Sequence, residues 1–419
     1  MVRLRLEVWQ RNLVIMWFAQ FITVVGFSFV FPFVPLFIQD ELDVSNPGRA
    51  ALWSGIAGSG MGFSLFLTGP IWGILGDRFG RKKNVMRALY GSAVTMSLTG
   101  LVANVYQLTA LRFMTGMVSG VFAPSLALVA SGTPKERVGF ATGVLQSAMF
   151  LGSTLGPLFG GFVAELVGFR VSFFVTGSLL ALAGTVVAVF VHEDFHREER
   201  VSGAGRRSPL RDMASLAFSP SLLPVLLLIY LVQVAPTLMG PVLPVFVREL
   251  EPQLSASQVT GMIFAVMGVS NTVSALTVAR LSRRVSMKSI MMAGCFASAV
   301  AYVPMYLVGA LAPLVANIAL LGLLSGGMVA SAMALVALAV PPEKHGTAYG
   351  IVQSASALAF GFGPLIGGSV ATLLGLRSVF LVNLGAFFLA GVLVSRLLGA
   401  RALTPVAPGV PAAATRAND

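Results

Sequence analysis

Long apolar stretches, separated by short polar segments, run through most of this 419-residue chain. About 20 consecutive apolar residues let one α-helix cross the hydrocarbon core of a bilayer. We predict a membrane-spanning helix for each of twelve stretches: 12–38, 52–75, 84–104, 107–130, 138–166, 170–192, 221–247, 257–281, 288–309, 313–339, 346–372 and 377–397. The pattern therefore predicts an all-α membrane protein with twelve transmembrane helices.

The longest polar interruption divides these stretches six and six. We predict that residues 1–192 form an N-terminal six-helix bundle and residues 221–397 a C-terminal one. Residues 193–220, rich in charged side chains, are expected to form a cytoplasmic linker between them. The tail 398–419 is rich in Pro and Ala and lacks apolar periodicity, so we predict a disordered cytoplasmic segment.

The two halves also resemble each other in sequence. Residues of the fifth and sixth stretches recur 207 positions later, so that Gly156-Pro157 reappears as Gly363-Pro364. The other residues that recur at this offset are Gly143, Gln146, Ser147, Gly160, Gly161, Gly168, Arg170 and Phe173. Such a repeat predicts two bundles related by pseudo-symmetry.

Composition excludes a soluble protein, because 56% of the residues are hydrophobic and only 11% are charged. The net charge of +12 comes from basic residues at the ends of spans, not from an extended basic face, so no nucleic-acid partner is expected. With both termini in the cytoplasm, only Arg49, Arg170, Arg248 and Arg377 among the 28 Lys and Arg fall outside. The positive-inside rule thus predicts a multi-pass protein of the plasma (inner) membrane with cytoplasmic termini.

Candidate chemistry is sparse. One cysteine and three histidines rule out a disulfide framework and a Cys/His metal cluster. The spans hold no nucleophile or cluster of paired acids, so we expect neither an enzyme nor a cofactor or metal. The expected partners are a small-molecule substrate, protons and the lipid bilayer, with the protein as a monomer.

One polar turn stands between the second and third stretches. It combines the residues Gly73, Gly76, Asp77, Arg78, Gly80, Arg81, Lys82 and Lys83. The glycines are expected to permit close approach and tight turning. This segment resembles the loop between helices 2 and 3 of the major facilitator superfamily, which implies that family's fold of two six-helix bundles.

The second half repeats the bases of this turn but not the acid, since Arg283 stands where Asp77 would be. The resemblance implies that Asp77 makes a charge contact between the bundles that breaks during transport. A simple helix cap by Asp77 remains the alternative.

A glycine-rich pattern in the fifth stretch consists of Gly152, Gly156, Pro157, Gly160 and Gly161. Glycines four apart allow a second helix to pack closely, and a proline bends the helix. The pattern resembles the motif that this superfamily's antiporters carry, which implies exchange and not uptake. Ordinary glycine-mediated packing is the alternative, and the copy in the second half is consistent with it.

Arg112 is the one charged residue that we place well inside a span. A charge at a helix centre costs roughly 2.5–3.5 kcal/mol even on lenient insertion scales, so it needs a partner or a water-filled cavity. Its surroundings resemble the family motif whose arginine is implicated in proton coupling; snorkelling to the interface is the alternative. Because the first four spans hold no embedded acid, the coupling candidates are Arg112, Asp77 and Glu165.

A few amide, aromatic and thioether side chains within the spans are candidates for an apolar substrate cavity with some hydrogen-bonding capacity. These residues are Gln20, Phe27, Gln146, Gln233, Asn271, Met328 and Gln353. Hydrogen bonds between helices are the alternative role for each amide. Such a cavity would suit lipophilic or amphipathic substrates.

Over nearly its whole length the chain resembles bacterial twelve-span drug:proton antiporters, and most of all their MdtG-type multidrug-resistance subgroup. The residues that suggest this subgroup are Trp9, Arg11-Asn12-Leu13 and Phe31-Pro32-Phe33-Val34-Pro35. The resemblance implies proton-coupled efflux of lipophilic or amphipathic drugs by alternating access. A proton-coupled symporter that imports a small nutrient is the alternative.

Overall fold

The computed structural model describes residues 7–30, 32–193, 215–219, 222–340 and 345–397, without the side chains of Asp77, Gln353 and a few others. The first half contains α1 (Val8–Phe29), α2 (Val34–Glu41), α3 (Pro47–Phe79), α4 (Arg81–Thr99), α5 (Val105–Val118), α6 (Phe122–Gly132), the short η1 (Lys135–Arg137), α7 (Val138–Val167) and α8 (Phe169–Phe190). The second half contains α10 (Leu223–Met239), α11 (Leu243–Leu250), α12 (Ala256–Leu281), α13 (Met287–Leu307), α14 (Leu311–Ala339), α15 (His345–Leu374) and α16 (Ser378–Leu397). No strand occurs among the described residues.

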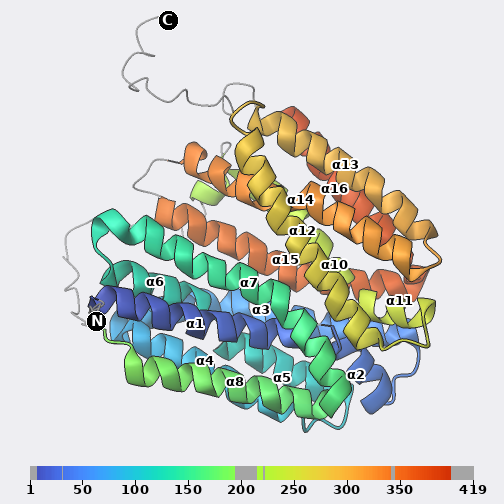
Figure 1. Cartoon of the computed structure of the whole chain (residues 1–419), viewed down its shortest axis with the longest axis horizontal. Helices are drawn as coiled ribbons and strands as arrows, with labels where there is room; N and C mark the ends of the chain where they lie inside the picture. The colour runs from blue at the N-terminus through green and yellow to red at the C-terminus, as the bar shows by residue number, and fades with distance from the viewer. Residues whose placement is uncertain (1–6, 31, 194–214, 220–221, 341–344, 398–419) are drawn as a thin grey trace, which may run out of the picture.

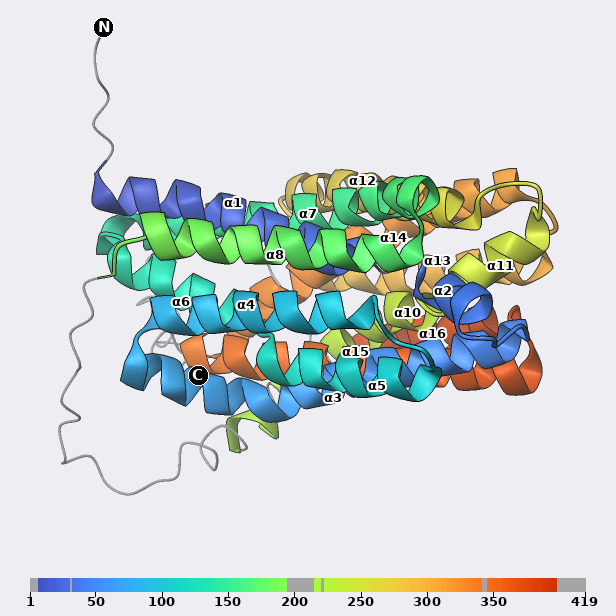
Figure 2. The same cartoon turned by 90° about the horizontal axis from the view of Figure 1, so that it is seen from below.

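The two halves of the chain lie side by side as two helix bundles, drawn in blue to green and in yellow to red (Figure 1). The long helices of both bundles run in a common direction (Figure 2). We call the end where α8 stops and α10 begins the linker end, and the end that carries α2 and α11 the distal end. The architecture confirms the predicted all-α fold of two bundles. Most of the predicted linker, and the whole predicted tail 398–419, lie outside the described residues.

Ten of the described helices, or helix pairs joined end to end, are long and apolar enough to cross a membrane, and the bent pair α10 and α11 makes up to eleven. The predicted span 84–104 corresponds to α4, which instead begins at Arg81. Its first turns carry Lys82, Lys83 and Arg87, so its mean hydropathy is lower than that of the other spans.

Three predicted spans are each broken into two helices, which the apolar pattern did not show. The span 12–38 divides into α1 and α2, and the span 221–247 into α10 and α11, with a bend of 42° in the second pair. Pro35 and Pro244 lie at the starts of α2 and α11, where the missing N–H of proline costs no helix hydrogen bond. The third break, between α5 and α6, is centred on Gly120, whose φ of 92° favours glycine.

Apolar side chains form two cores in the first half and one that lies mainly in the second half, with Leu36 and Ala51 of the first half at its edge. The linker-end cluster of the first half includes Met16, Leu89 and Leu180, and the distal cluster includes Phe33 and Phe173. Each bundle therefore has its own interior. The contacts between the bundles are made mainly by α3 with α15 and by α7 with α12.

Candidate functional site

The α3–α15 seam is built on glycines that bring two backbones together. A Cβ atom added at Gly62 would lie 2.6 Å from the backbone nitrogen of Gly361, and one at Gly368 would lie 2.6 Å from the carbonyl oxygen of Ala51. Both distances are too short for any side chain. The aromatic rings of Phe63 and Phe362 meet edge to face beside this contact, with centroids 4.9 Å apart.

The α7–α12 seam is built in the same way from the antiporter-type motif. A Cβ added at Gly261 would lie 2.5 Å from the carbonyl oxygen of Pro157, and Gly161 meets the backbone of Ser257. The remaining motif glycines face α1 of their own bundle: a Cβ at Gly156 would lie 2.7 Å from the Cβ of Ser28. The motif therefore has two packing faces, one within the bundle and one between the bundles.

Its copy in the second half uses its residues in the same way. Gly363 and Gly367 pack against α10 of their own bundle, whereas Pro364 and Gly368 contact α3 of the other. The 207-residue repeat in sequence is thus a repeat in packing. This supports the packing interpretation of the motif, which holds alongside any role in antiport.

Close approach at these glycines is confined to the distal half of each seam. Toward the linker end, a Cβ added at Gly69 of α3, at Gly139 or Gly143 of α7, or at Gly350 of α15 would meet no described atom within 4 Å. The two seams therefore draw the bundles together at the distal end.

Polar contacts between the bundles also lie at the distal end. The guanidinium of Arg248 on α11 donates two hydrogen bonds to Asp40 on α2, at 2.6 and 2.7 Å. Thr372 on α15 donates to the carbonyl oxygen of Gly48 at 2.7 Å. Glu165 at the end of α7 accepts from the hydroxyl of Ser255, which precedes α12. Sequence reasoning named Glu165 as a candidate but missed the Asp40–Arg248 pair. Its signal in the sequence was that Asp40 follows Pro32 and Pro35 and that Arg248 follows the equivalent Pro241 and Pro244.

We expect Arg248→Glu to open the distal end, because two carboxylates then face each other there. The pair is partly exposed, and such pairs are worth about 0.2–1 kcal/mol, so the population of the open form should rise by about two- to fivefold. The rate at which a thiol reagent modifies Ser257→Cys, a buried seam position, measures this population. The exchanged pair Asp40→Arg with Arg248→Glu is the control and should restore slow modification; fast modification of this double variant would contradict the pairing.

The turn between α3 and α4 lies at the linker end. Gly80 ends α3 with a φ of 104°, and Gly76 approaches the side-chain amide of Asn84, where an added Cβ would lie 2.7 Å away. Gly73 does not share this role, contrary to our expectation, because an added Cβ there meets nothing within 4 Å. The side chain of Asp77 lies outside the described part of the structure, so its role stays a prediction.

The basic residues of this turn contact the rest of the first bundle. Lys82 donates to the carbonyl oxygen of Ala188 at 2.8 Å and Arg81 to that of Ala127 at 3.3 Å, while Arg78 is exposed. Glu193, which sequence reasoning did not single out, accepts from the backbone amides of Arg81 and Lys82 at 2.8 and 2.9 Å. A carboxylate is favourable at this helix N-terminus.

A second residue missed by sequence reasoning is Arg87, two turns into α4. Its guanidinium donates to the carbonyl oxygens of Val118 at 2.8 Å and Ser119 at 3.5 Å, where the helix breaks between α5 and α6. It also lies 3.5 Å from the ring centre of Trp72, whose indole donates to the carbonyl oxygen of Met117 at 2.6 Å. These donors satisfy the carbonyls that the break leaves without helical partners.

We expect Arg87→Met to destabilise the protein by about 1–3 kcal/mol, because buried carbonyl oxygens lose their charged donor. Thermal unfolding of the purified protein in detergent measures this loss. Arg87→Lys should recover part of the stability, since an ammonium can reach one carbonyl but cannot form the guanidinium fork. Equal stability of Arg87→Met and the wild type would show that the break needs no such support.

Arg112 lies on α5 within the first bundle and is only 7% exposed. Its Nη2 atom is buried without a hydrogen-bond partner among the described residues, and its guanidinium carbon lies 5.8 Å from the ring centre of Phe173. A cation over an aromatic face is attracted to it, but this contact replaces only part of the lost hydration. The side chain therefore does not snorkel to the surface, which was the alternative interpretation.

The predicted cavity residues are distributed over several helices. Gln20 on α1 and Asn271 on α12 each bury a side-chain oxygen without a hydrogen-bond partner among the described residues. Gln233 donates to the hydroxyl of Ser356 within the second bundle at 2.6 Å, as the alternative role predicted. Gln146 is exposed on α7, and Phe27 packs against the linker-end core.

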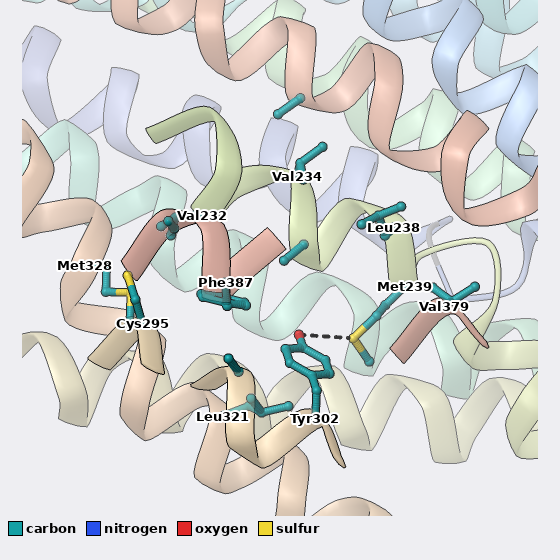
Figure 3. Close-up of a cluster of buried hydrophobic side chains, with 14 of the residues drawn as sticks. Val232, Val234, Leu238, Met239, Cys295, Tyr302, Leu321, Met328, Val379 and Phe387 are labelled. Carbon is teal, nitrogen blue, oxygen red and sulfur yellow. Dashed lines mark hydrogen bonds between the residues drawn. The ribbon is translucent and has the colours of Figure 1, made fainter. Parts of the chain in front are cut away.

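Met328 does not belong with these residues. It is 3% exposed in the core of the second bundle, and its sulfur lies 3.8 Å from that of Cys295 (Figure 3). The same core holds Tyr302, whose hydroxyl points to the sulfur of Met239 at 3.7 Å. Met328 is therefore a packing residue. The sequence did not show this, because an apolar stretch does not reveal which face of its helix turns inward. The side chain of Gln353 lies outside the described residues.

Comparison with known proteins gives a consistent result. A family model described as the Major Facilitator Superfamily matches residues 16–320 and 259–417. The chain is 32% identical to the multidrug resistance protein MdtG of Enterobacter lignolyticus, over 90% of this chain and 89% of that protein. It is also 32% identical to the multi-drug resistance efflux pump PmrA of Streptococcus pneumoniae, over 89% of this chain and 92% of that protein.

Solved structures agree at the level of the fold. A bacterial homologue of the human lysosomal transporter Spinster, in an inward-facing and occupied conformation, superimposes with a TM-score of 0.75 at 13% identity, covering 94% of this chain and 98% of the other. The human organic anion transporter MFSD10 (TETRAN) gives a TM-score of 0.68 at 20% identity, covering 93% and 100%.

Proposed function

This chain belongs to the major facilitator superfamily and is a membrane transporter, and from this premise we propose that it exports lipophilic or amphipathic drugs in exchange for protons. The proposal includes alternating access, in which the two bundles rock against each other around a site between them. The names of the relatives, a multidrug resistance protein and an efflux pump, support this choice of substrate and direction.

The observation that carries the proposal is the asymmetry of the two seams. Backbone contacts at Gly62, Gly161 and Gly368, together with the Asp40–Arg248 pair, join the bundles from the middle of the seams to the distal end, whereas the described glycines toward the linker end make no such contact. Contacts of this kind can break together when the bundles rotate, because they consist of small residues without interlocking side chains and of one partly exposed ion pair. A seam fixed along its whole length would not allow such a change.

The proton carrier is proposed to lie among Arg112, Asp77 and Glu165. Of the two whose side chains are described, Glu165 is the one with a contact that crosses between the bundles, through Ser255. Protonation of a carboxylate removes the charge that strengthens such a hydrogen bond. Protonation of Glu165 would therefore weaken this contact between the bundles.

Transport of a fluorescent lipophilic cation such as ethidium into proteoliposomes that hold a pH-sensitive dye tests the coupling. With the lumen acidic, we expect ethidium to accumulate while the lumen becomes more alkaline, since a proton leaves for each exchange. Movement of protons in the same direction as ethidium would indicate a symporter, which was the alternative prediction. Liposomes without protein provide the control for passive entry.

We further propose that the distal end faces the outside of the cell and the linker end the cytoplasm. In intact cells, an impermeant thiol reagent should modify Ser45→Cys, which is exposed between α2 and α3, and should leave Ser202→Cys in the predicted linker unmodified. The native Cys295 is buried and should not react. Permeabilised cells provide the control, where both sites should react. The reverse pattern in intact cells would overturn the orientation.

A further inference from the structure

An apolar crevice of about 500 Å³ lies where α3, α5 and α15 meet. Its wall includes Phe63 from α3, Phe113 and Met114 from α5, and Leu365 from α15. Phe113 and Met114 are 42% and 49% exposed, so the crevice is open on the side of α5. Because that surface belongs to a membrane-spanning segment and is apolar, the opening faces the acyl chains of the bilayer. This volume lies within the range of sites for drug-sized molecules.

One polar group in this crevice has no partner. Ser59 is 3% exposed and lines the wall, and its hydroxyl oxygen is buried without a hydrogen bond among the described residues. Neighbouring hydroxyls behave differently: Ser64 donates to the carbonyl oxygen of Met61 at 3.0 Å, and Thr109 to that of Val105 at 2.8 Å. An unpaired hydroxyl in an apolar setting is costly, and an acceptor on a ligand would remove that cost.

We propose that this crevice binds an uncharged lipophilic compound that carries a hydrogen-bond acceptor and enters from the bilayer. Among the described residues the wall contains no charged side chain, which disfavours an ionic ligand, and the unpaired hydroxyl of Ser59 is the donor that such a compound would engage. The occupant is a drug-sized molecule and not a phospholipid tail, because an acyl chain offers no acceptor at the depth of Ser59. The site is separate from Gln20, Asn271 and the other predicted cavity residues whose side chains are described, because these lie on other helices.

Occupancy of the crevice depends on the closed distal seam. Among the described wall residues, Leu365 alone comes from the second bundle, and it follows Pro364, which packs against Gly55 and Gly58 of α3. When α3 and α15 separate, Leu365 leaves the crevice and the ligand loses that wall. A ligand with more contacts in one state shifts the equilibrium toward that state. The compound therefore holds the distal end closed and slows transport. The binding itself does not depend on the proposed drug efflux.

Photolabelling with benzophenone, an uncharged lipophilic ketone, tests the site on the full-length protein in phosphatidylcholine nanodiscs. We expect labelling within 56–63 or 109–114. A Cβ at Gly60 would lie 3.8 Å from that of Phe113, an ordinary contact, so Gly60→Leu fills the crevice without moving the backbone and should abolish labelling. Gly69→Leu on the same helix, where an added Cβ meets nothing within 4 Å, is the matched control and should be labelled like the wild type.

Ser59→Ala adds no bulk and tests the polar contact. It should weaken benzophenone binding by about three- to tenfold, the usual effect of one hydrogen bond. Diphenylmethane, which lacks the carbonyl, should compete equally well in Ser59→Ala and the wild type. Labelling only at other sites, or undiminished labelling of Gly60→Leu, would overturn the proposal. So would a diazirine-bearing phospholipid that labels the crevice and is not displaced by benzophenone.

Discussion

Gly62→Leu is expected to abolish most transport while the protein remains folded. A side chain at this position would collide with the backbone of Gly361, so the α3–α15 seam cannot close in its present form. Overpacking of a tight contact costs about 1–3 kcal/mol. Because ~1.4 kcal/mol changes an equilibrium constant tenfold, the ratio of distal-closed to distal-open molecules should fall by about five- to 150-fold.

Proteoliposome transport, with thermal unfolding measured in parallel, provides the test. Gly69→Leu adds the same bulk to the linker-end half of the same helix, where an added Cβ meets nothing within 4 Å, and should leave the distal-closed population unchanged. Wild-type transport by Gly62→Leu would mean that the cycle does not need the seam to close this tightly, and the proposed mechanism would lose its main support.

Arg112→Met is expected to abolish proton-coupled transport and at the same time to stabilise the protein. The buried guanidinium has one nitrogen without a hydrogen-bond partner in the described part of the chain and one distant aromatic contact, so its removal relieves a desolvation cost. We expect a gain on the order of 1–3 kcal/mol in the free energy of unfolding. A residue kept at a cost in stability is a candidate for function.

The comparison with Arg87 makes this prediction sharper. Arg87→Met should lower stability because its guanidinium serves two carbonyl groups, whereas Arg112→Met should raise it. Thermal unfolding of both variants, measured together with ethidium-driven proton movement, separates the two roles. Arg112→Lys should recover transport only in part. Full coupled transport in Arg112→Met would assign the arginine to packing and leave Asp77 and Glu165 as the coupling candidates.

Apolar periodicity predicted most helices of this fold to within a few residues. It failed at the three breaks, because a run of apolar residues continues unchanged through the turn at Pro32–Pro35 and through Gly120. The sequence signals of these breaks were the prolines themselves and Gly120, whose neighbours did not indicate why a glycine is needed at that position. The donors that stabilise the break between α5 and α6, Arg87 and Trp72, come from other helices, so no local pattern could show them.

The candidate site was predictable where the repeat carried information. The Gly156-Pro157 pattern and its copy predicted close helix packing, which the structure shows, but not that their helices join the bundles or that each motif has two faces. Met328 was misplaced because the cavity and core faces of one helix are both apolar. The Asp40–Arg248 pair joins residues 208 positions apart, and only the tertiary structure brings them together.

Double electron–electron resonance on two spin-label pairs tests the central claim of alternating access most directly. One pair, at Ser45 and Gln253, would span the distal end, and the other, at Lys83 and Arg284, the linker end, with Cys295 replaced by alanine. Without substrate we expect a single short distal distance. Adding ethidium under an imposed pH gradient should lengthen the distal distance and shorten the linker-end distance in the same fraction of molecules. Two distances that stay fixed, or that lengthen together, would contradict the account.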